Sequence, residues 1–190
     1  MPVKPTAVAA CRDEDPDAPI RMDRPGHNDG RELWRLARDC GGLDLNSPYC
    51  YVLWCRDFAR TSVVARDGRT VVGFVTGHVR PDAPGTLFVW QVAVDDAYRG
   101  RRIARRMLDH LGLVMAELGC RHMEATVTPD NAASMRMFES FARAHGAPFA
   151  WTAGFGSEMF PDHHQPEALI RIGPLPLRQD ARTDQALRRE

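Results

Sequence analysis

The chain has 190 residues, 44% of them hydrophobic, and its 25 lysine and arginine residues balance 25 aspartate and glutamate residues. This length and composition are typical of one domain with a substantial hydrophobic core. The zero net charge gives no support to binding of nucleic acid or of an anionic membrane surface.

The cysteines and the apolar segments bear on where the chain works. The five cysteines are odd in number and form no C-x-x-C pair, which argues against a disulfide framework or a zinc site. We therefore expect a reducing compartment, the cytoplasm. There is no apolar run of about eighteen residues and no signal-peptide core near the start, so neither a membrane span nor secretion is expected.

The two ends of the sequence differ from its middle. Residues 1–19 are rich in proline and aspartate and poor in large apolar side chains, which predicts a disordered N-terminal extension. Residues 176–190 have a similar character and are expected to form a flexible C-terminal tail. The segment between them, residues 20–175, shows no repeat and no clear linker, so we expect one compact domain.

The first predicted element is a helix. Asp29 followed three residues later by Glu32 is typical of a helix start, and Gly41-Gly42 then ends the helix. The next segment, residues 43–58, is mixed, and Asn46-Ser47-Pro48 within it indicates a turn or the entry to a helix.

A β meander follows this mixed segment. Residues 61–65 and 70–79 are β-branched runs, and the Asp67-Gly68 pair between them is a good hairpin signal. Residues 81–85 predict a second turn, which leads into a third strand over residues 86–94.

The second half alternates helices and strands. One helix has an apolar face formed by Ile103, Met107, Leu108, Leu111 and Met115. It ends at Gly119, and residues 122–127 then alternate apolar and polar side chains as a strand does. A second helix begins at about Ala132, and residues 147–155 and 167–172 form closing strands. This order predicts an α/β (α+β) fold in which helices pack on a mixed, mostly antiparallel sheet.

Arginines gather at the predicted strand-to-helix turn, at positions 99, 101, 102, 105 and 106. A helix N-terminus presents free N–H groups and a positive dipole, and Gly100 lets the backbone approach a ligand closely. Guanidinium groups bind phosphate oxygens well, so the turn is a candidate phosphate site. A solvated basic helix end is the alternative. The Walker and dinucleotide glycine patterns are both absent.

The sequence VAVDDAYRGRRIARRML around this turn resembles the acetyl-CoA motif of the GNAT family of N-acetyltransferases. Arg99, Gly100, Ile103 and Ala104 fit that motif, whereas Arg102 stands where the family usually has glycine. About thirty residues later, TPDNAASMRMF resembles a second family signature. The resemblance implies the GNAT acyl-CoA N-acyltransferase fold, with a splayed central strand pair.

The resemblance also implies acetyl-CoA as co-substrate and no metal. The strand after Trp90 would pair with pantetheine, the turn would hold the pyrophosphate, and an N–H near Val92 would stabilise the oxyanion. The implied cofactor-binding residues are Val92, Ala93, Val94, Arg99, Gly100, Arg101, Arg102, Ile103, Ala104, Asn131, Ser134 and Phe138. Many family members have a tyrosine near Phe138 that protonates the thiolate. Its absence leaves another residue, water or the substrate's ammonium group to do so.

Segments across residues 20–172 resemble one subfamily, the L-2,4-diaminobutyrate acetyltransferases of ectoine biosynthesis. The most specific segment is LDLNSPYCYVL, residues 43–53, because a general GNAT protein has no need for it. The resemblance implies acetyl transfer to the γ-amine of diaminobutyrate by a homodimer, with neither nucleic acid nor membrane as partner.

Acidic and aromatic side chains are candidates for the acceptor pocket. A substrate with two ammonium groups needs acids to hold it and to take up a proton. The first candidate for the base is Asp44 and the second is Glu167. The candidate substrate-binding residues are Asp44, Tyr49, Trp90, Glu158, His164 and Glu167.

Each candidate has a simpler reading. Asp44 could cap a helix near Asn46, Trp90 could be core packing, Tyr49 a structural hydrogen bonder and Glu158 merely exposed. Asp162, His163 and His164 are more typical of a solvent loop than of a metal site. Pro166 argues against a helix on which His164 and Glu167 would share a face.

Two rival functions remain open at this point. One is a GNAT enzyme acting on another small amine, a polyamine or a protein N-terminus. The other is a protein that senses acetyl-CoA without catalysis, which Arg102 and the missing tyrosine favour slightly.

Overall fold

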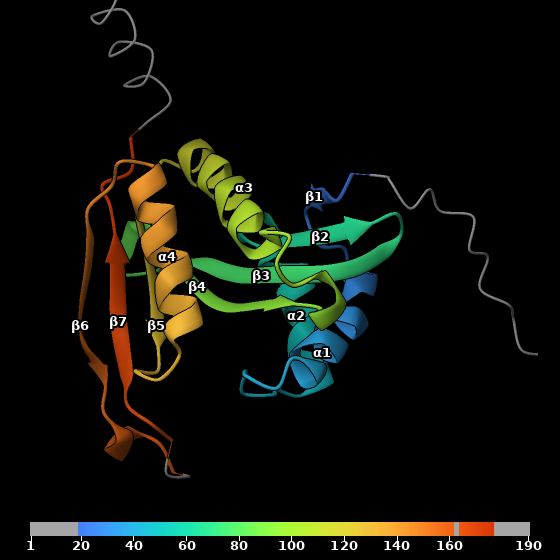
Figure 1. The fold of residues 1–190 in the computed structure, drawn as a ribbon, viewed down its shortest axis with the longest axis horizontal. Helices are drawn as coiled ribbons and strands as arrows, with labels where there is room; N and C mark the ends of the chain where they lie inside the picture. Colours follow the sequence, from blue (N-terminus) through green and yellow to red (C-terminus); the bar gives the residue numbers. More distant parts are fainter. Residues whose placement is uncertain (1–18, 162–163, 177–190) are drawn as a thin grey trace, which may run out of the picture.

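The computed structural model describes residues 19–161 and 164–176 (Figure 1). The expected N-terminal extension and C-terminal tail lie almost wholly outside this part, as do Asp162 and His163. Within it, seven strands form one sheet in the order β1-β2-β3-β4-β5-β7-β6. Neighbouring strands are antiparallel except for β4 and β5, which are parallel, so the predicted mixed, mostly antiparallel sheet is confirmed.

The elements alternate along the chain much as the sequence predicts. The strands are β1 (Arg21–Asp23), β2 (Val63–Asp67), β3 (Thr70–Arg80), β4 (Ala83–Val94), β5 (His122–Val127), β6 (Phe149–Phe155) and β7 (Glu167–Ile172). The α-helices are α1 (Gly30–Asp39), α2 (Pro48–Asp57), α3 (Ile103–Glu117) and α4 (Ala132–Ala144). Short 3-10 helices are η1 (His27–Asp29), η2 (Ala59–Thr61), η3 (Asp96–Tyr98) and η4 (Ser157–Met159).

Two local predictions need correction. The turn expected over residues 81–85 is shorter, because β4 already begins at Ala83. Asp29 does stand at the start of α1, but its side chain does not cap the helix. Its Oδ2 instead accepts hydrogen bonds from Arg66 Nη2 and the Gly26 amide, so the carboxylate ties the helix to β2.

The mixed segment forms a helix, α2, because its first residues carry strong start signals. The Ser47 hydroxyl accepts a hydrogen bond from the Cys50 amide, and Pro48 occupies the first helical turn, where a missing N–H costs nothing. Asp44 therefore does not cap this helix.

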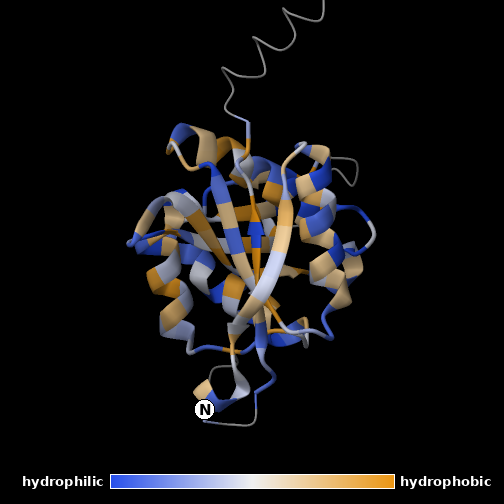
Figure 2. Cartoon of the chain, turned by 90° about the vertical axis from the view of Figure 1, so that its left-hand side faces the viewer, coloured by the Kyte–Doolittle hydropathy of each residue, from blue (hydrophilic) through white to orange (hydrophobic). Residues whose placement is uncertain are grey.

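Helices cover both faces of the sheet and enclose two cores. Met107, Leu111 and Phe141 from α3 and α4 pack in one core, and Leu33 and Tyr51 from α1 and α2 pack in the other. Figure 2 shows the end of the sheet that carries β6 and β7, with helices on either side of the strands.

The parallel strands β4 and β5 diverge before they end. Their pairing runs from Thr86 with His122 to Val89 with Ala125, although both strands continue beyond it. On the other edge of β4, Thr76 pairs with Gln91 and Gly77 with Val89, which leaves Trp90 as the extra residue of a β-bulge. Figure 1 shows that the strands on either side of this point run in clearly different directions. The splay predicted from the family resemblance is present.

Candidate active site

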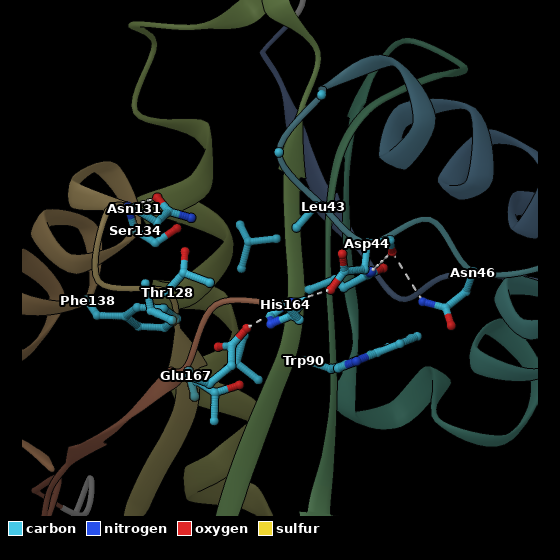
Figure 3. A pocket seen from close by; sticks show the side chains of 18 residues that line it. Leu43, Asp44, Asn46, Trp90, Thr128, Asn131, Ser134, Phe138, His164 and Glu167 are labelled. Atoms are coloured by element: carbon cyan, nitrogen blue, oxygen red, sulfur yellow. Dashed lines mark hydrogen bonds and ion pairs between the residues drawn. The ribbon is translucent and has the colours of Figure 1, made fainter. Parts of the chain in front are cut away.

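The divergence of β4 and β5 opens a cavity of about 370 Å³, here called the central cavity (Figure 3). Its lining residues are Gly41, Gly42, Leu43, Asp44, Asn46, Val89, Trp90, Gln91, Val92, Ala125, Thr126, Val127, Thr128, Asn131, Ser134, Phe138, His164 and Glu167. Eight of the site candidates expected from the sequence thus line this cavity: Asp44, Trp90, Val92, Asn131, Ser134, Phe138, His164 and Glu167.

A second cavity, of about 940 Å³, lies between the N-terminal part of α3 and the length of α4, and it shares Val92 and Ser134 with the central cavity. We call it the arginine-lined cavity because four arginines, Arg101, Arg102, Arg105 and Arg106, contribute to its wall. Val94 and Ala104 line it as well. The two cavities adjoin at Val92 and Ser134, so together they reach from the helix end to the gap between the strands.

The N-terminus of α3 opens to this second cavity without a side-chain cap. Ser47 caps α2 and Asn131 caps α4 by accepting from the Ser134 amide, whereas no side chain does so for α3. Gly100, with φ of 80°, and Arg102, with φ of 57°, are both left-handed and turn the backbone into the helix. The first amides of α3 are therefore available to an anionic ligand.

The arginines of the turn have different roles in the structure. Arg99 pairs with Asp96 at 2.6 Å and does not line the arginine-lined cavity. Arg105 bonds to Asp109 and Ser140, and Arg106 donates to the Ile20 carbonyl. The guanidinium of Arg101 lies over the Tyr98 ring. Ile103 is buried, so its amide but not its side chain can meet a ligand.

An imidazole joins two carboxylates at the edge of the central cavity. His164 Nε2 lies 3.1 Å from Asp44 Oδ2 and 3.7 Å from Glu167 Oε1 (Figure 3). The segment that carries His164 is not helical, so the two residues meet without sharing a helix face. Asp44 comes from the loop before α2, more than a hundred residues away in the chain.

The contacts of His164 favour its doubly protonated form. His164 Nδ1 lies 2.6 Å from the Gln165 carbonyl, which can only accept, so Nδ1 carries a proton. Nε2 can then donate to Asp44 only as an imidazolium. The Gln165 carbonyl and then Asp44 raise the pKa of His164, which favours that form. Burial raises the pKa of Glu167, although Thr126 and His164 act against it.

The Asp44 carboxylate is 81% exposed, yet its backbone is held. Its carbonyl accepts a hydrogen bond from Gln91 Nε2 at 2.9 Å and another from Asn46 Nδ2 at 3.3 Å. Gln91 lies beside Trp90 in the bulge of β4, so this irregularity fixes the loop as well as the strand.

A third cavity, of about 670 Å³, meets the central cavity and is here called the outer cavity. Asp44, Trp90, Thr126, His164 and Glu167 line both cavities. The outer cavity is lined further by His78, Arg80, Phe88, Glu124, Ala153, Gly154, Phe155, Phe160 and Leu169. The acid–imidazole group therefore stands where a ligand in the central cavity would meet one in the outer cavity.

Two of the acceptor candidates lie away from these cavities. Tyr49 is 68% exposed on α2, and Glu158 is exposed in η4, with its carboxylate against the backbone of Gly156. Three residues at the site were not expected from the sequence: Trp54, whose indole stacks on Trp90, and the lining residues Gln91 and Thr126. Gln91 is a buried polar residue inside an apolar strand, a signal that could have marked it.

The structure also bears on metals, membranes and redox state. Over residues 19–161 and 164–176, no group of three or more His, Cys, Asp or Glu side chains could hold a metal ion. In the same part, no helix is both long and apolar enough to span a bilayer. Cys40, Cys50, Cys55 and Cys120 are free thiols.

Known proteins share both the sequence and this fold. The family model described as Acetyltransferase (GNAT) family matches residues 30–142. The L-2,4-diaminobutyric acid acetyltransferase of Streptomyces coelicolor is 55% identical over 161 residues, which are 83% of this chain and 95% of that protein. The protein of the same name from Nocardia farcinica is 47% identical over 80% of this chain and 78% of its own length.

Solved structures agree with these relatives. Diaminobutyrate acetyltransferase EctA from Paenibacillus lautus, in complex with L-2,4-diaminobutyric acid and coenzyme A, is 44% identical, with a TM-score of 0.78 over 82% of this chain and 95% of that one. Ard1 from Thermoplasma volcanium, at 17% identity, shares the fold with a TM-score of 0.70 over 82% of this chain and 99% of that one. The chain belongs to the GNAT acetyltransferase family and, within it, to the group of the L-2,4-diaminobutyric acid acetyltransferases.

Proposed function

We propose that this chain transfers the acetyl group of acetyl-CoA to the γ-amine of L-2,4-diaminobutyrate. The observation that carries the proposal is the group of Asp44, His164 and Glu167 at the junction of the central and outer cavities. A diamine acceptor needs negative charge beside its ammonium groups and a group that can take up a proton. The named relatives at high identity support the same acceptor.

Acetyl-CoA fits the path formed by the central and arginine-lined cavities. In this arrangement, the backbone of Val92, Ala93 and Val94 pairs with the pantetheine amides where β5 has diverged from β4. The uncapped amides of α3 and the guanidinium groups of Arg101 and Arg102 hold the pyrophosphate. Three residues of α4 and its cap complete the wall: Asn131, Ser134 and Phe138.

The acceptor enters from the outer cavity, with Trp90 as a shared wall. Glu167 accepts the proton of the γ-ammonium, directly or through water, and the raised pKa of its buried carboxyl suits this role. The free amine then attacks the thioester carbon to form a tetrahedral oxyanion, which the Val92 N–H stabilises. The carbon–sulfur bond breaks, the nitrogen of the intermediate gives up its extra proton, and the CoA thiolate takes up that proton, directly or through water, as it leaves.

Asp44 and His164 orient the acceptor in this scheme. The Asp44 carboxylate binds an ammonium group, and the imidazolium of His164 holds both carboxylates in place. Asp44 is the alternative base, because it is the more exposed of the two acids and a water can reach it.

We further propose that the enzyme is a cytoplasmic homodimer that acts in ectoine biosynthesis. The four free thiols support a reducing compartment. The edge strand β6 supports a dimer interface, because Trp151 is 62% exposed on it and Phe155 is exposed as well. Sedimentation of the full chain, with Trp151→Ser as the test variant, measures this assembly.

The deciding experiment measures release of free thiol from acetyl-CoA with diaminobutyrate, ornithine, lysine and spermidine as acceptors, and identifies the acetylated nitrogen by NMR. We expect diaminobutyrate to react fastest and at its γ-amine. Turnover with spermidine alone would contradict the proposal. Acetyl-CoA binding without turnover on any acceptor would instead indicate a sensor.

A further inference from the structure

A buried carboxylate in the wall of the outer cavity lies between two arginines. Glu124, on β5, is 2% exposed. Its Oε2 accepts from Arg80 Nη1 at 2.7 Å and its Oε1 from Arg171 Nη1 at 2.8 Å. Arg171 is the register partner of Glu124 on β7, and Arg80 reaches it from the end of β3.

The two arginines are not equivalent with respect to the cavity. Two guanidinium groups against one carboxylate leave one positive charge in excess. Arg80 lines the outer cavity, whereas Arg171 does not. A guanidinium has five N–H donors, and the contact with Glu124 engages only Nη1 of Arg80. The excess charge and its donors are thus offered to the cavity through Arg80.

The outer cavity is consequently charged in opposite ways at its two ends. Glu124 and Thr126 are two residues apart on one strand face, which separates them by roughly 6 to 7 Å. The Thr126 side chain hydrogen bonds to Glu167, which lies four residues before Arg171 on β7, so the acid is displaced along the sheet from the Glu124 ion pairs. Burial and Arg80 lower the pKa of His78, which also lines the cavity, so its imidazole stays neutral at neutral pH. Phe88 and Trp90 make the rest of this wall aromatic.

We propose that Arg80 binds the α-carboxylate of the acceptor and that Glu124 is the positioning residue that holds its guanidinium group. The inference rests on the proposed function, and it identifies the acceptor group that this part of the cavity binds. An extended diaminobutyrate places its γ-nitrogen roughly 5 Å from its carboxylate carbon. With the carboxylate on Arg80, the γ-amine comes to Glu167 and the thioester.

The test compares two acceptors that differ by the carboxylate alone, diaminobutyrate and 1,3-diaminopropane, on the full-length enzyme. For Arg80→Met we expect kcat/KM with diaminobutyrate to fall roughly 10- to 100-fold. The value for 1,3-diaminopropane, measured as a substrate or as a competitive inhibitor, changes less than about threefold. Arg80→Lys recovers part of the loss, because it keeps the charge but not the fork geometry.

Arg171→Met is the matched control, since it also leaves Glu124 with one arginine but alters no residue of the cavity wall. We expect it to affect both acceptors alike and weakly. Equal losses on both acceptors in Arg80→Met, or the same selective loss in Arg171→Met, would overturn the inference. If the wild-type enzyme does not acetylate diaminobutyrate, the proposed function itself is wrong. This outcome is distinguishable from failure of the inference about Arg80, because it is measured on the wild-type enzyme alone.

Discussion

The indole rings of Trp54 and Trp90 stack with their centroids 4.5 Å apart and an interplanar angle of 18°. Trp54 belongs to α2 and Trp90 to the bulge of β4, so the contact fixes a helix against the irregular part of a strand. Trp54 also lies against Phe58 and His78. The orientation of the wall shared by the central and outer cavities thus depends on a helix that does not itself line them.

We predict that Trp54→Leu weakens acceptor binding, although Trp54 itself does not contact the acceptor. The aromatic stack is worth about 0.5–1.5 kcal/mol, so KM for diaminobutyrate should rise roughly 2- to 10-fold. The dissociation constant for acetyl-CoA should stay within about twofold. Trp34→Leu on α1 is the control, because Trp34 packs on the α1–α2 core and should lower stability alone. If Trp54→Leu changed KM for diaminobutyrate and the dissociation constant for acetyl-CoA equally, its effect would be on the fold rather than on the orientation of Trp90.

We predict that Asp44→Asn lowers kcat/KM for diaminobutyrate by roughly 100-fold, in the range typical for loss of a group in acid–base catalysis. Acetyl-CoA affinity, measured by calorimetry, should change little, because the pyrophosphate is held in the arginine-lined cavity, which Asp44 does not line. The side chain is exposed, so the melting temperature should also hold. Asp57→Asn, at the exposed end of α2, is the matched control. An equal loss of acetyl-CoA affinity would show that Asp44 is misplaced in the acceptor pocket.

We predict that Glu167 sets the acidic limb of the pH–rate profile. Burial raises its pKa above the usual 4.5, so kcat/KM should fall at a correspondingly higher pH as the base becomes protonated. The negative charge of Asp44 contributes to the raised pKa of Glu167. In Asp44→Asn, the acidic limb of the pH–rate profile, measured on the remaining activity, should therefore move to lower pH. A limb that stays at the usual glutamate pKa would contradict the role of Glu167.

The raised pKa of Glu167 also makes the stability of the fold depend on pH. A carboxyl with a raised pKa binds more protons in the folded state, so its contribution to stability is lost as pH rises from the usual glutamate value through the raised one. Glu167→Gln should therefore abolish most activity yet keep or raise the melting temperature at neutral pH. Glu158→Gln, which removes an exposed charge outside the cavities, should change neither.

We predict that Arg102→Gly relieves backbone strain at residue 102 but weakens the binding of acetyl-CoA. A non-glycine residue in the left-handed region costs roughly 1–2 kcal/mol, while glycine costs about 0.5–1 kcal/mol in unfolded-chain entropy. Stability should thus stay equal or rise by up to about 1 kcal/mol. KM for acetyl-CoA should increase severalfold and become less sensitive to salt, since one phosphate-facing charge is lost. Arg143→Ala, with the same charge change on α4, should alter neither quantity.

Local patterns were enough to predict much of the fold. Residues 122–127 alternate strictly and became β5, and the helix expected from about Ala132 became α4, which the structure shows to be capped by Asn131. The hairpin at Asp67-Gly68 followed from turn chemistry alone. Each of these depends on residues that are neighbours in the chain, where the physics of caps, turns and alternation acts directly.

Contacts between distant segments could not be read in this way. Nothing around Asp44 indicates His164, because the contact forms only when the loop before α2 meets the segment before β7. Glu124 sits on the polar face of its strand, which predicts exposure, but arginines from β3 and β7 cover it. The resemblance to the subfamily identified Asp44 and Glu167, whereas the sequence pattern alone did not bring them together.

The short parallel register between β4 and β5 has a consequence for ligand-dependent stability. Only four residue pairs join two antiparallel blocks, β1–β4 and β5–β7, so few backbone hydrogen bonds hold the blocks together at the seam between them. A pantetheine arm lying along residues 92–94 would add bonds at this seam and act as a temporary strand. Amide exchange at residues 90–94 and 125–128 should then slow most when CoA binds, and the two blocks should unfold together rather than in sequence.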